Sequence, residues 1–278
     1  MLQQEIDSLA PSRDFSRRGF VKTAVGSGFA AAVLPVTAQT IKTDSEGLTV
    51  GEVMIPVGDF KMPAYRAQPA GKTGLPVVLV VSEIFGVHEH IADVARRFAK
   101  LGYLAIAPEL FVRQGDAQSY GEIAKLVSEV IAKVPDKQVM GDLDAAVAWA
   151  KANGGDTSKL GITGFCWGGR TTWMYAAHNA AVKAAVPWYG PVARSYFPGD
   201  KPALDMAANV KAAVLALYGG ADPGIPNDTV EKMMAAIKAA GNTKSELVIY
   251  PDTPHAFHAD SRPSDRQEQA EDGRKRAV

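Results

Sequence analysis

Hydrophobic and polar positions follow strand-like patterns from residue 48 onward. The ranges 48–57 and 60–68 carry apolar residues at alternate positions on either side of a Gly58-Asp59 turn, which is typical of a β-hairpin. The next range, 75–81, is apolar throughout and rich in valine. Such a run is typical of a strand buried on both faces of a parallel sheet. We therefore expect an N-terminal hairpin followed by a central strand.

Strand and helix patterns then alternate along most of the remaining chain. The predicted strands cover 103–107, 160–163, 184–188, 213–218 and 246–250, and the predicted helices cover 91–101, parts of 119–134, 141–152, 168–178 and 229–240. Alternation of this kind produces right-handed crossovers and a parallel sheet covered on both faces. The predicted fold class is α/β, with a mostly parallel central sheet, helices on both faces and an N-terminal antiparallel hairpin. The polar range 264–278 is expected to bury little area and to be frayed or disordered.

The first 38 residues have the pattern of an export signal. Ser16-Arg17-Arg18-Gly19-Phe20 precedes a small-residue apolar run, and Val36-Thr37-Ala38 suits a cleavage site. The run is shorter than the roughly 20 apolar residues that a spanning helix needs. We expect a twin-arginine signal peptide over 1–38, recognition by the twin-arginine export machinery, and a periplasmic location. A disordered tail with a chance arginine pair and an uncleaved membrane anchor are the alternatives.

Charge and cysteine content narrow the classes of partner and site. Thirty basic residues balance 30 acidic ones, so the chain has no net charge that would attract nucleic acid or an anionic membrane surface. We therefore expect no nucleic-acid partner, and no stable membrane association after the signal is removed. The single cysteine, Cys166, excludes an intramolecular disulfide and a cysteine-based metal cluster. We expect a monomer. An exposed thiol is vulnerable in an oxidising compartment, so Cys166 is expected either to be buried or to have a chemical role.

Residues that can carry chemistry follow four of the predicted strands. In chain order they are Glu83, Cys166, Asp222 and His255. Ligands of open parallel sheets bind in the crevice beyond the carboxyl ends of the strands. These four side chains are therefore expected to share one cleft.

Cys166 stands in the pattern of a nucleophile elbow. The segment Gly164-Phe165-Cys166-Trp167-Gly168 matches G-x-S-x-G with cysteine in place of serine, between a predicted strand and a predicted helix. Glycines permit the tight, strained turn, and the helix N-terminus favours a thiolate. We interpret Cys166 as the nucleophile of an acyl transfer. The alternative is a small buried apolar side chain, as most lone cysteines are.

Asp222 and His255 follow Cys166 in the order nucleophile, acid, histidine that α/β-hydrolases use. The corresponding roles are a general base for His255 and, for Asp222, selection of the imidazole tautomer. Asp222 could instead be a turn residue beside Pro223. His258 is the alternative histidine, and we favour His255 because it follows the predicted strand more directly.

The remaining histidines indicate no metal site. His88, His90 and His178 are expected at the surface or at helix ends. His88-Glu89-His90 supplies too few convergent ligands for a metal hydrolase. No cofactor and no metal are expected.

Five segments of the chain resemble the dienelactone hydrolase family, the carboxymethylenebutenolidases. They are Ser82-Glu83-Ile84-Phe85-Gly86, Ala107-Pro108-Glu109-Leu110-Phe111, Gly164-Phe165-Cys166-Trp167-Gly168-Gly169, Gly219-Gly220-Ala221-Asp222 and His255-Ala256-Phe257. The resemblance implies one α/β-hydrolase catalytic domain over 39–278. It further implies a hydrolase that opens a lactone or small carboxylic ester through a Cys-His-Asp triad and a thioester acyl-enzyme.

The resemblance also implies roles outside the triad. Glu83 would contact the resting thiol and help to ionise it, and the backbone N–H groups of Ile84 and Trp167 would form the oxyanion hole. Arg113 matches one of two arginines that hold the substrate carboxylate. The second would fall at Ala259, which leaves the dienelactone itself in doubt.

Two other functions remain open at this point. One is a general small-ester or thioester hydrolase. The other is a non-catalytic periplasmic protein that binds a ligand or senses redox state through an oxidisable Cys166, because fold alone does not determine function.

Overall fold

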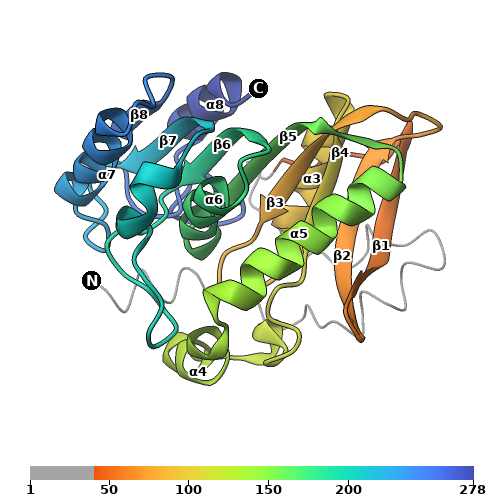
Figure 1. Ribbon diagram of the computed structural model, residues 1–278, viewed down its shortest axis with the longest axis horizontal. Helices are drawn as coiled ribbons and strands as arrows, with labels where there is room; N and C mark the ends of the chain where they lie inside the picture. Colours follow the sequence, from red (N-terminus) through yellow and green to blue (C-terminus); the bar gives the residue numbers. More distant parts are fainter. Residues whose placement is uncertain (1–40) are drawn as a thin grey trace.

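A single eight-stranded sheet runs through the computed structural model, which describes residues 41–278 (Figure 1). The predicted signal over 1–38 lies outside the described residues. The strand order is β1-β2-β4-β3-β5-β6-β7-β8. The strands are β1 (Leu48–Val57), β2 (Phe60–Pro69), β3 (Leu75–Val81), β4 (Leu104–Pro108), β5 (Gly155–Phe165), β6 (Val182–Trp188), β7 (Ala213–Gly219) and β8 (Glu246–Tyr250).

The strand directions confirm the predicted α/β class. β1 and β2 form an antiparallel hairpin in which Val57 pairs with Phe60, and β2 is also antiparallel to β4. Every pairing from β4 through β3 to β8 is parallel. The carboxyl ends of β3, β5, β7 and β8 therefore meet at one edge of the sheet, where ligands of such sheets bind.

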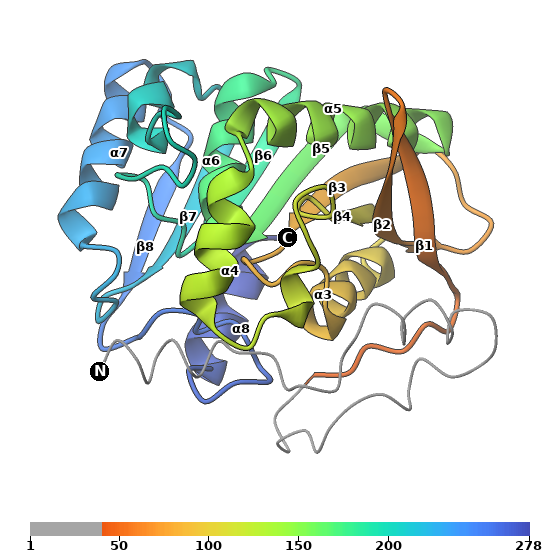
Figure 2. The same ribbon diagram turned by 90° about the horizontal axis from the view of Figure 1, so that it is seen from below.

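Helices cover both faces of this sheet. Figure 2 shows α5, α6 and α7 on one side, and α3 and α8 on the other. The helices are α3 (Glu89–Lys100), α4 (Ile123–Glu129), α5 (Asp136–Ala152), α6 (Trp167–His178), α7 (Asn227–Ala239) and α8 (Gln267–Arg276), with short 3-10 turns η2 (Ala117–Ser119), η3 (Ile131–Lys133) and η4 (Ala203–Asn209). Within 41–278, none of the helices has both the length and the apolar character that crossing a bilayer requires.

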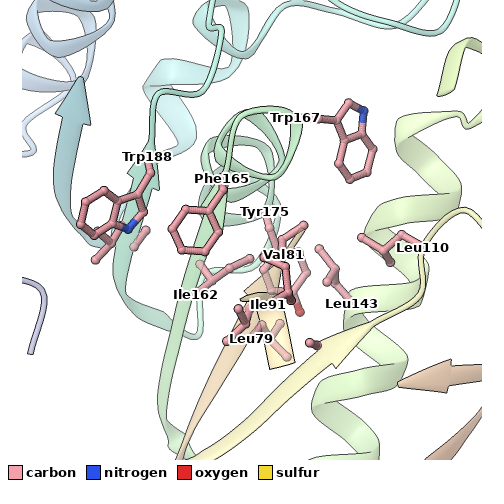
Figure 3. Packing of buried hydrophobic residues seen from close by; sticks show 14 of the residues in the cluster. Leu79, Val81, Ile91, Leu110, Leu143, Ile162, Phe165, Trp167, Tyr175 and Trp188 are labelled. Atoms are coloured by element: carbon pink, nitrogen blue, oxygen red, sulfur yellow. The ribbon is translucent and has the colours of Figure 1, made fainter. Parts of the chain in front are cut away.

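The core lies between the sheet and these helices. Leu79 and Val81 of β3 are fully buried, and Ile162 and Phe165 of β5 are nearly so. Figure 3 shows these side chains grouped around the two central strands. Each such side chain contributes about 1.5–3 kcal/mol by leaving water. The strand ends that precede Glu83 and Cys166 are thus firmly packed.

Two elements begin five residues before their predicted starts. β5 begins at Gly155, five residues before the predicted start, and α5 begins at Asp136 rather than Gly141. The first residues of β5 are polar and partly exposed, so they lack the apolar signal of a buried strand. Pro135 precedes the first turn of α5, a position where proline is tolerated.

The C-terminal segment corrects the expectation of a frayed tail. Residues 267–276 form α8, in which Ala270 and Gly273 are buried. A Cβ atom on Gly273 would lie 2.6 Å from the Trp188 ring, and the Tyr250 hydroxyl donates a hydrogen bond of 2.8 Å to Asp272. The prediction was wrong because α8 docks through small residues that allow close approach, a contact that a count of large apolar side chains does not detect.

Candidate active site

Cys166 lies on a strained turn between β5 and α6. Its backbone has φ 54° and ψ −114°, in a region that non-glycine residues rarely adopt. A Cβ atom on Gly164 would lie 2.3 Å from the Gly168 carbonyl oxygen, and one on Gly168 would lie 2.3 Å from the Val81 carbonyl oxygen. Both glycines are therefore needed for the chain to turn this tightly against β3. The turn places Cys166 directly before the positive end of the α6 dipole.

His255 and Asp222 form a hydrogen-bonded pair beside Cys166. The distance from His255 Nδ1 to Asp222 Oδ2 is 2.6 Å, and Asp222 Oδ1 accepts the Gly224 N–H at 2.9 Å. Because a carboxylate only accepts hydrogen bonds, Nδ1 carries the proton. Nε2 is then the nitrogen available to Cys166, whose side chain also hydrogen-bonds to His255.

The charge state of His255 follows from these two neighbours. Burial by itself lowers the pKa of His255, but the Cys166 charge and the hydrogen bonds with Asp222 and Cys166 raise it to about 10. At neutral pH the imidazole is therefore protonated and lies between the Asp222 carboxylate and the Cys166 side chain.

His258, the alternative histidine, occupies a different environment. Its ring lies 4.4 Å from the Trp188 ring and 4.9 Å from the Phe165 ring, measured between centroids. Burial and the positive charge of nearby groups, beginning with His90, hold the pKa of His258 well below its usual range. It is a neutral core side chain, and the hydrogen bond to Asp222 belongs to His255.

Glu83 lies at the end of β3 and is hydrogen-bonded to His88 rather than to Cys166. The distance from His88 Nε2 to Glu83 Oε2 is 2.9 Å, and the Glu83 side chain is only 3% exposed. Burial tends to raise the pKa of Glu83, but the charge and hydrogen bond of His88, followed by the charge of Arg262, lower it well below its usual range. The other oxygen, Oε1, is buried with no hydrogen-bond partner among residues 41–278.

His88 and His90 lie at the N-terminus of α3, one of the two places expected for them, but His90 is buried and His88 half-buried rather than exposed at the surface. His90 is 6% exposed and its Nδ1 lies 3.2 Å from Asp260 Oδ1, while the His88 side chain is 14% exposed. The two rings stack with their centroids 6.2 Å apart. Within 41–278, no group of three or more histidine, cysteine or acidic side chains is placed to hold a metal ion. These histidines instead extend the polar network of the site.

Two side chains hold the loop that carries Ile84. The Val87 N–H donates to Glu109 Oε1 at 3.1 Å, and the Gln118 side-chain amide donates to the Val87 carbonyl at 3.1 Å. Gly86 has φ 74°, and a Cβ atom there would lie 2.8 Å from Glu109 Oε2. The 107–111 segment therefore supports the 82–86 segment directly.

Trp167 is the first residue of α6, so its N–H has no partner within the helix. Its ring packs against Phe111 with the centroids 4.7 Å apart. The backbone of Trp167 thus lies directly after the candidate nucleophile, and its side chain is held in the core.

Arg113 is already paired in the structure. Its guanidinium makes an ion pair with the buried carboxylate of Asp142 on α5 and lies 4.8 Å from the centre of the Phe60 ring. A substrate anion would have to compete with Asp142 for this charge.

Arg262 is a site residue that the sequence did not reveal. Its guanidinium lies 5.0 Å from the centre of the Phe85 ring, and its charge lowers the pKa of Glu83. One of its nitrogens, Nη1, is buried and has no hydrogen-bond partner in the described part of the chain. Arg262 follows His255 by seven residues on the same loop, a spacing that carries no local signal. It brings an unpaired positive charge to the edge of the site.

Two tyrosines line the space around the thiol. The Tyr189 ring lies 5.0 Å from the His255 ring, and burial followed by the charges of Glu83 and Cys166 raises the pKa of Tyr189 well above its usual range. Burial and the Cys166 charge raise the pKa of Tyr196 to about 12. Both phenols stay protonated at neutral pH, and Tyr189 is fully buried while Tyr196 is half-buried.

Comparison with known proteins places these residues in a family context. Residues 62–278 match the sequence profile of the "Dienelactone hydrolase family". Two relatives carry the name "Putative carboxymethylenebutenolidase": one from Methylorubrum extorquens, 58% identical over 98% of this chain and 94% of that protein, and one from Salmonella typhimurium, 52% identical over 91% and 94%.

A solved structure supports the same assignment. The crystal structure of a "Putative Dienelactone Hydrolase" from Klebsiella pneumoniae superposes with a TM-score of 0.79 at 52% sequence identity, covering 82% of this chain and 96% of that one. The family profile, which matches residues 62–278, spans the strands and loops that hold Cys166, Asp222 and His255. Shared sequence over most of its length, with the shared fold, shows that this chain belongs to the dienelactone hydrolase family and is a carboxylic ester hydrolase.

Proposed function

We propose that the protein opens a lactone or small carboxylic ester through a thioester acyl-enzyme on Cys166. The observation that supports this most strongly is the contact of the Cys166 side chain with a protonated His255 that Asp222 orients. A nucleophile, an acid and a histidine in this chain order form the catalytic triad of α/β-hydrolases, with cysteine here in the place of serine. The names of the relatives point to the same chemistry in those proteins.

The reaction would proceed in two acyl-transfer steps. The Cys166 thiolate attacks the carbonyl carbon, and the carbonyl π electrons move onto the oxygen to form an oxyanion. When the oxyanion collapses, the C–O bond to the leaving group breaks and His255 gives its proton to the departing alkoxide. Neutral His255 then takes a proton from water, whose oxygen attacks the thioester and releases the acid and the thiolate.

Backbone N–H groups would stabilise the oxyanion. The Trp167 N–H has no partner within α6, and Ile84 lies on the loop that Glu109 and Gln118 hold in place. Each such donor is typically worth about 3 kcal/mol toward the tetrahedral transition state. Their rigidity matters because a donor that must reorganise during the reaction contributes less.

The charges around the site favour a substrate that carries an anionic group. Arg262 offers a guanidinium with a buried, unpaired nitrogen on the loop that carries His255. Arg113 is a second candidate, but its ion pair with Asp142 would have to be broken or shared before it could bind a substrate anion. We assign Arg262 as the main anchor for a carboxylate on the substrate.

Trapping the acyl-enzyme tests the nucleophile. Incubation with a lactone or activated ester, followed by acid quench and mass spectrometry, should show an adduct on Cys166. Cys166→Ala should abolish both the adduct and turnover, while His178→Asn on the far end of α6 serves as a matched control. Hydrolysis retained by Cys166→Ala would exclude the thiol mechanism.

Paired substrates separate the lactonase from a more general hydrolase. We expect an unsaturated lactone to be opened at least as efficiently as a linear ester of similar size. A preference of more than about tenfold, or 1.4 kcal/mol, for the linear ester would identify a small-ester or thioester hydrolase. Absence of activity on a broad ester panel would favour a binding or redox-sensing protein.

We also propose that 1–38 is a cleaved twin-arginine signal and that the mature protein is periplasmic. The arginine pair and the small-residue run support this. N-terminal sequencing of periplasmic material should begin near residue 39. Exclusively cytoplasmic material with an intact N-terminus would contradict it.

A further inference from the structure

We propose that His88 is a positioning residue that holds the Glu83 carboxylate away from the Cys166 thiol, so that the thiolate is ready before substrate arrives. The inference rests on the proposed role of Cys166 as nucleophile. It assigns a function to a histidine that the reaction steps do not otherwise use.

The sheet places Glu83 and Cys166 beside each other. Val81 of β3 pairs with Gly164 of β5. Glu83 and Cys166 each lie two residues after this pair, just past the ends of these two adjacent parallel strands. Both charges act on the same neighbour, because Glu83 and Cys166 each raise the pKa of Tyr189. The carboxylate and the sulfur therefore lie near the same Tyr189 side chain.

One hydrogen bond determines the direction of the carboxylate. Among residues 41–278, His88 Nε2 is the sole hydrogen-bond partner of the Glu83 carboxylate, because Oε1 has none. The carboxylate only accepts, so Nε2 is the donor. The loop between the two residues is fixed at Val87 by Glu109 and Gln118, which leaves rotation of the side chains as the available movement.

The charged groups around the pair explain why its arrangement matters. Glu83 faces His88 on its own loop, His90 at the start of α3 and Arg262 on the 255–266 loop, and all three favour its ionised form. Without His88, the carboxylate is free to turn toward the thiol and accept its S–H. A carboxylate beside sulfur disfavours the thiolate, so the resting enzyme would lose reactivity.

Alkylation of Cys166 by iodoacetamide, followed over pH without substrate, measures this reactivity directly. In His88→Asn, we expect about fivefold slower alkylation at pH 7 and a midpoint raised by roughly half a unit to one unit, because the shorter amide cannot reach Oε2. His88→Gln should stay within about twofold of the unmodified protein, since its amide nitrogen replaces Nε2 as donor. His178→Asn, exposed and paired with Asp144, is the control.

The double variant Glu83→Gln with His88→Asn gives the decisive comparison. It should restore the alkylation rate of the single His88→Asn variant to near that of the unmodified protein, because the neutral amide no longer opposes the thiolate. Unchanged alkylation in His88→Asn would overturn the proposal, as would equal losses in His88→Gln and His88→Asn, which would indicate packing alone.

Alkylation requires no turnover, so the two proposals fail separately. Absence of hydrolysis on every ester and lactone would refute the proposed function, while the effect of His88 on thiol reactivity could persist. Conversely, normal hydrolysis with identical alkylation profiles in all variants would refute only the positioning role. Thermal melting of each variant identifies any that fail to fold.

Discussion

Replacing Gly168 by alanine should damage catalysis more than stability. Gly168 lies in the elbow, and an added Cβ atom would lie 2.3 Å from the Val81 carbonyl oxygen and 2.5 Å from that of Ser82. Both atoms belong to the backbone at the end of β3, so they cannot rotate away. The elbow and β3 must separate for the variant to fold.

The size of this separation follows from the contact distances. Moving the Cβ atom from 2.3 Å to an ordinary contact of 3.4 Å requires a shift of about 1 Å between the two segments. A misplacement of about 1 Å between reacting groups can lower a rate by about 100-fold, or roughly 2.7 kcal/mol. Overpacking of this kind destabilises a fold by about 1–3 kcal/mol. Because Cys166 and Ile84 lie on opposite sides of the contact, the shift widens the proposed oxyanion hole.

The assay is kcat/KM on an activated ester together with thermal melting. We expect Gly168→Ala to remain folded at 25 °C with a rate about 100-fold lower. The matched control is Gly161→Ala on β5, the strand that leads into the elbow, where the nearest atom to an added Cβ lies at 3.7 Å. Its rate should stay near that of the unmodified protein. A Gly168→Ala variant with full activity would refute the argument that the elbow and β3 must remain in close contact.

Three further outcomes follow from the site and from α8. Asp222→Asn should lower the pKa of His255 from about 10. The alkaline limb of the kcat/KM profile, where the imidazolium loses the proton it donates, should therefore move down by about one pH unit or more. An alkaline limb that does not move would contradict the role of Asp222. Arg262→Leu should raise KM about tenfold for an anionic ester, about 1.4 kcal/mol, and leave a neutral ester nearly unchanged; equal effects on both esters would exclude the anchor. Gly273→Ala should lower Tm by about 4 °C because its Cβ atom meets the Trp188 ring at 2.6 Å, whereas an undocked helix would gain stability from alanine.

Patterns within single segments were sufficient to predict the sheet and the order of the candidate catalytic groups. The apolar run 75–81 and the hairpin around Gly58-Asp59 appear in the structure as expected. The elbow could be predicted because the spacing of its glycines indicates a tight backbone turn. Cys166 does adopt this strained conformation in the structure. These features are local, so neighbouring residues carry their signal.

The docking of α8 and the start of β5 could not be predicted from the pattern of neighbouring residues. α8 packs through Gly273 against Trp188, and the first residues of β5 are polar. Hydrophobic patterning measures the transfer of apolar area from water. Hydrophobic patterning does not detect a contact that depends on the absence of a side chain or on hydrogen bonding between backbones.

The sequence by itself determined that a thiol, a carboxylate and an imidazole would each follow a strand toward one edge of a parallel sheet. Only the tertiary structure decided that Glu83 bonds to His88 rather than to Cys166, and that Arg262 brings an unpaired charge beside it. The physical reason is that the direction and pKa of a buried charged group depend on whichever charges the fold packs against it. Arg262 is far from Glu83 along the chain, so no local pattern contains their interaction.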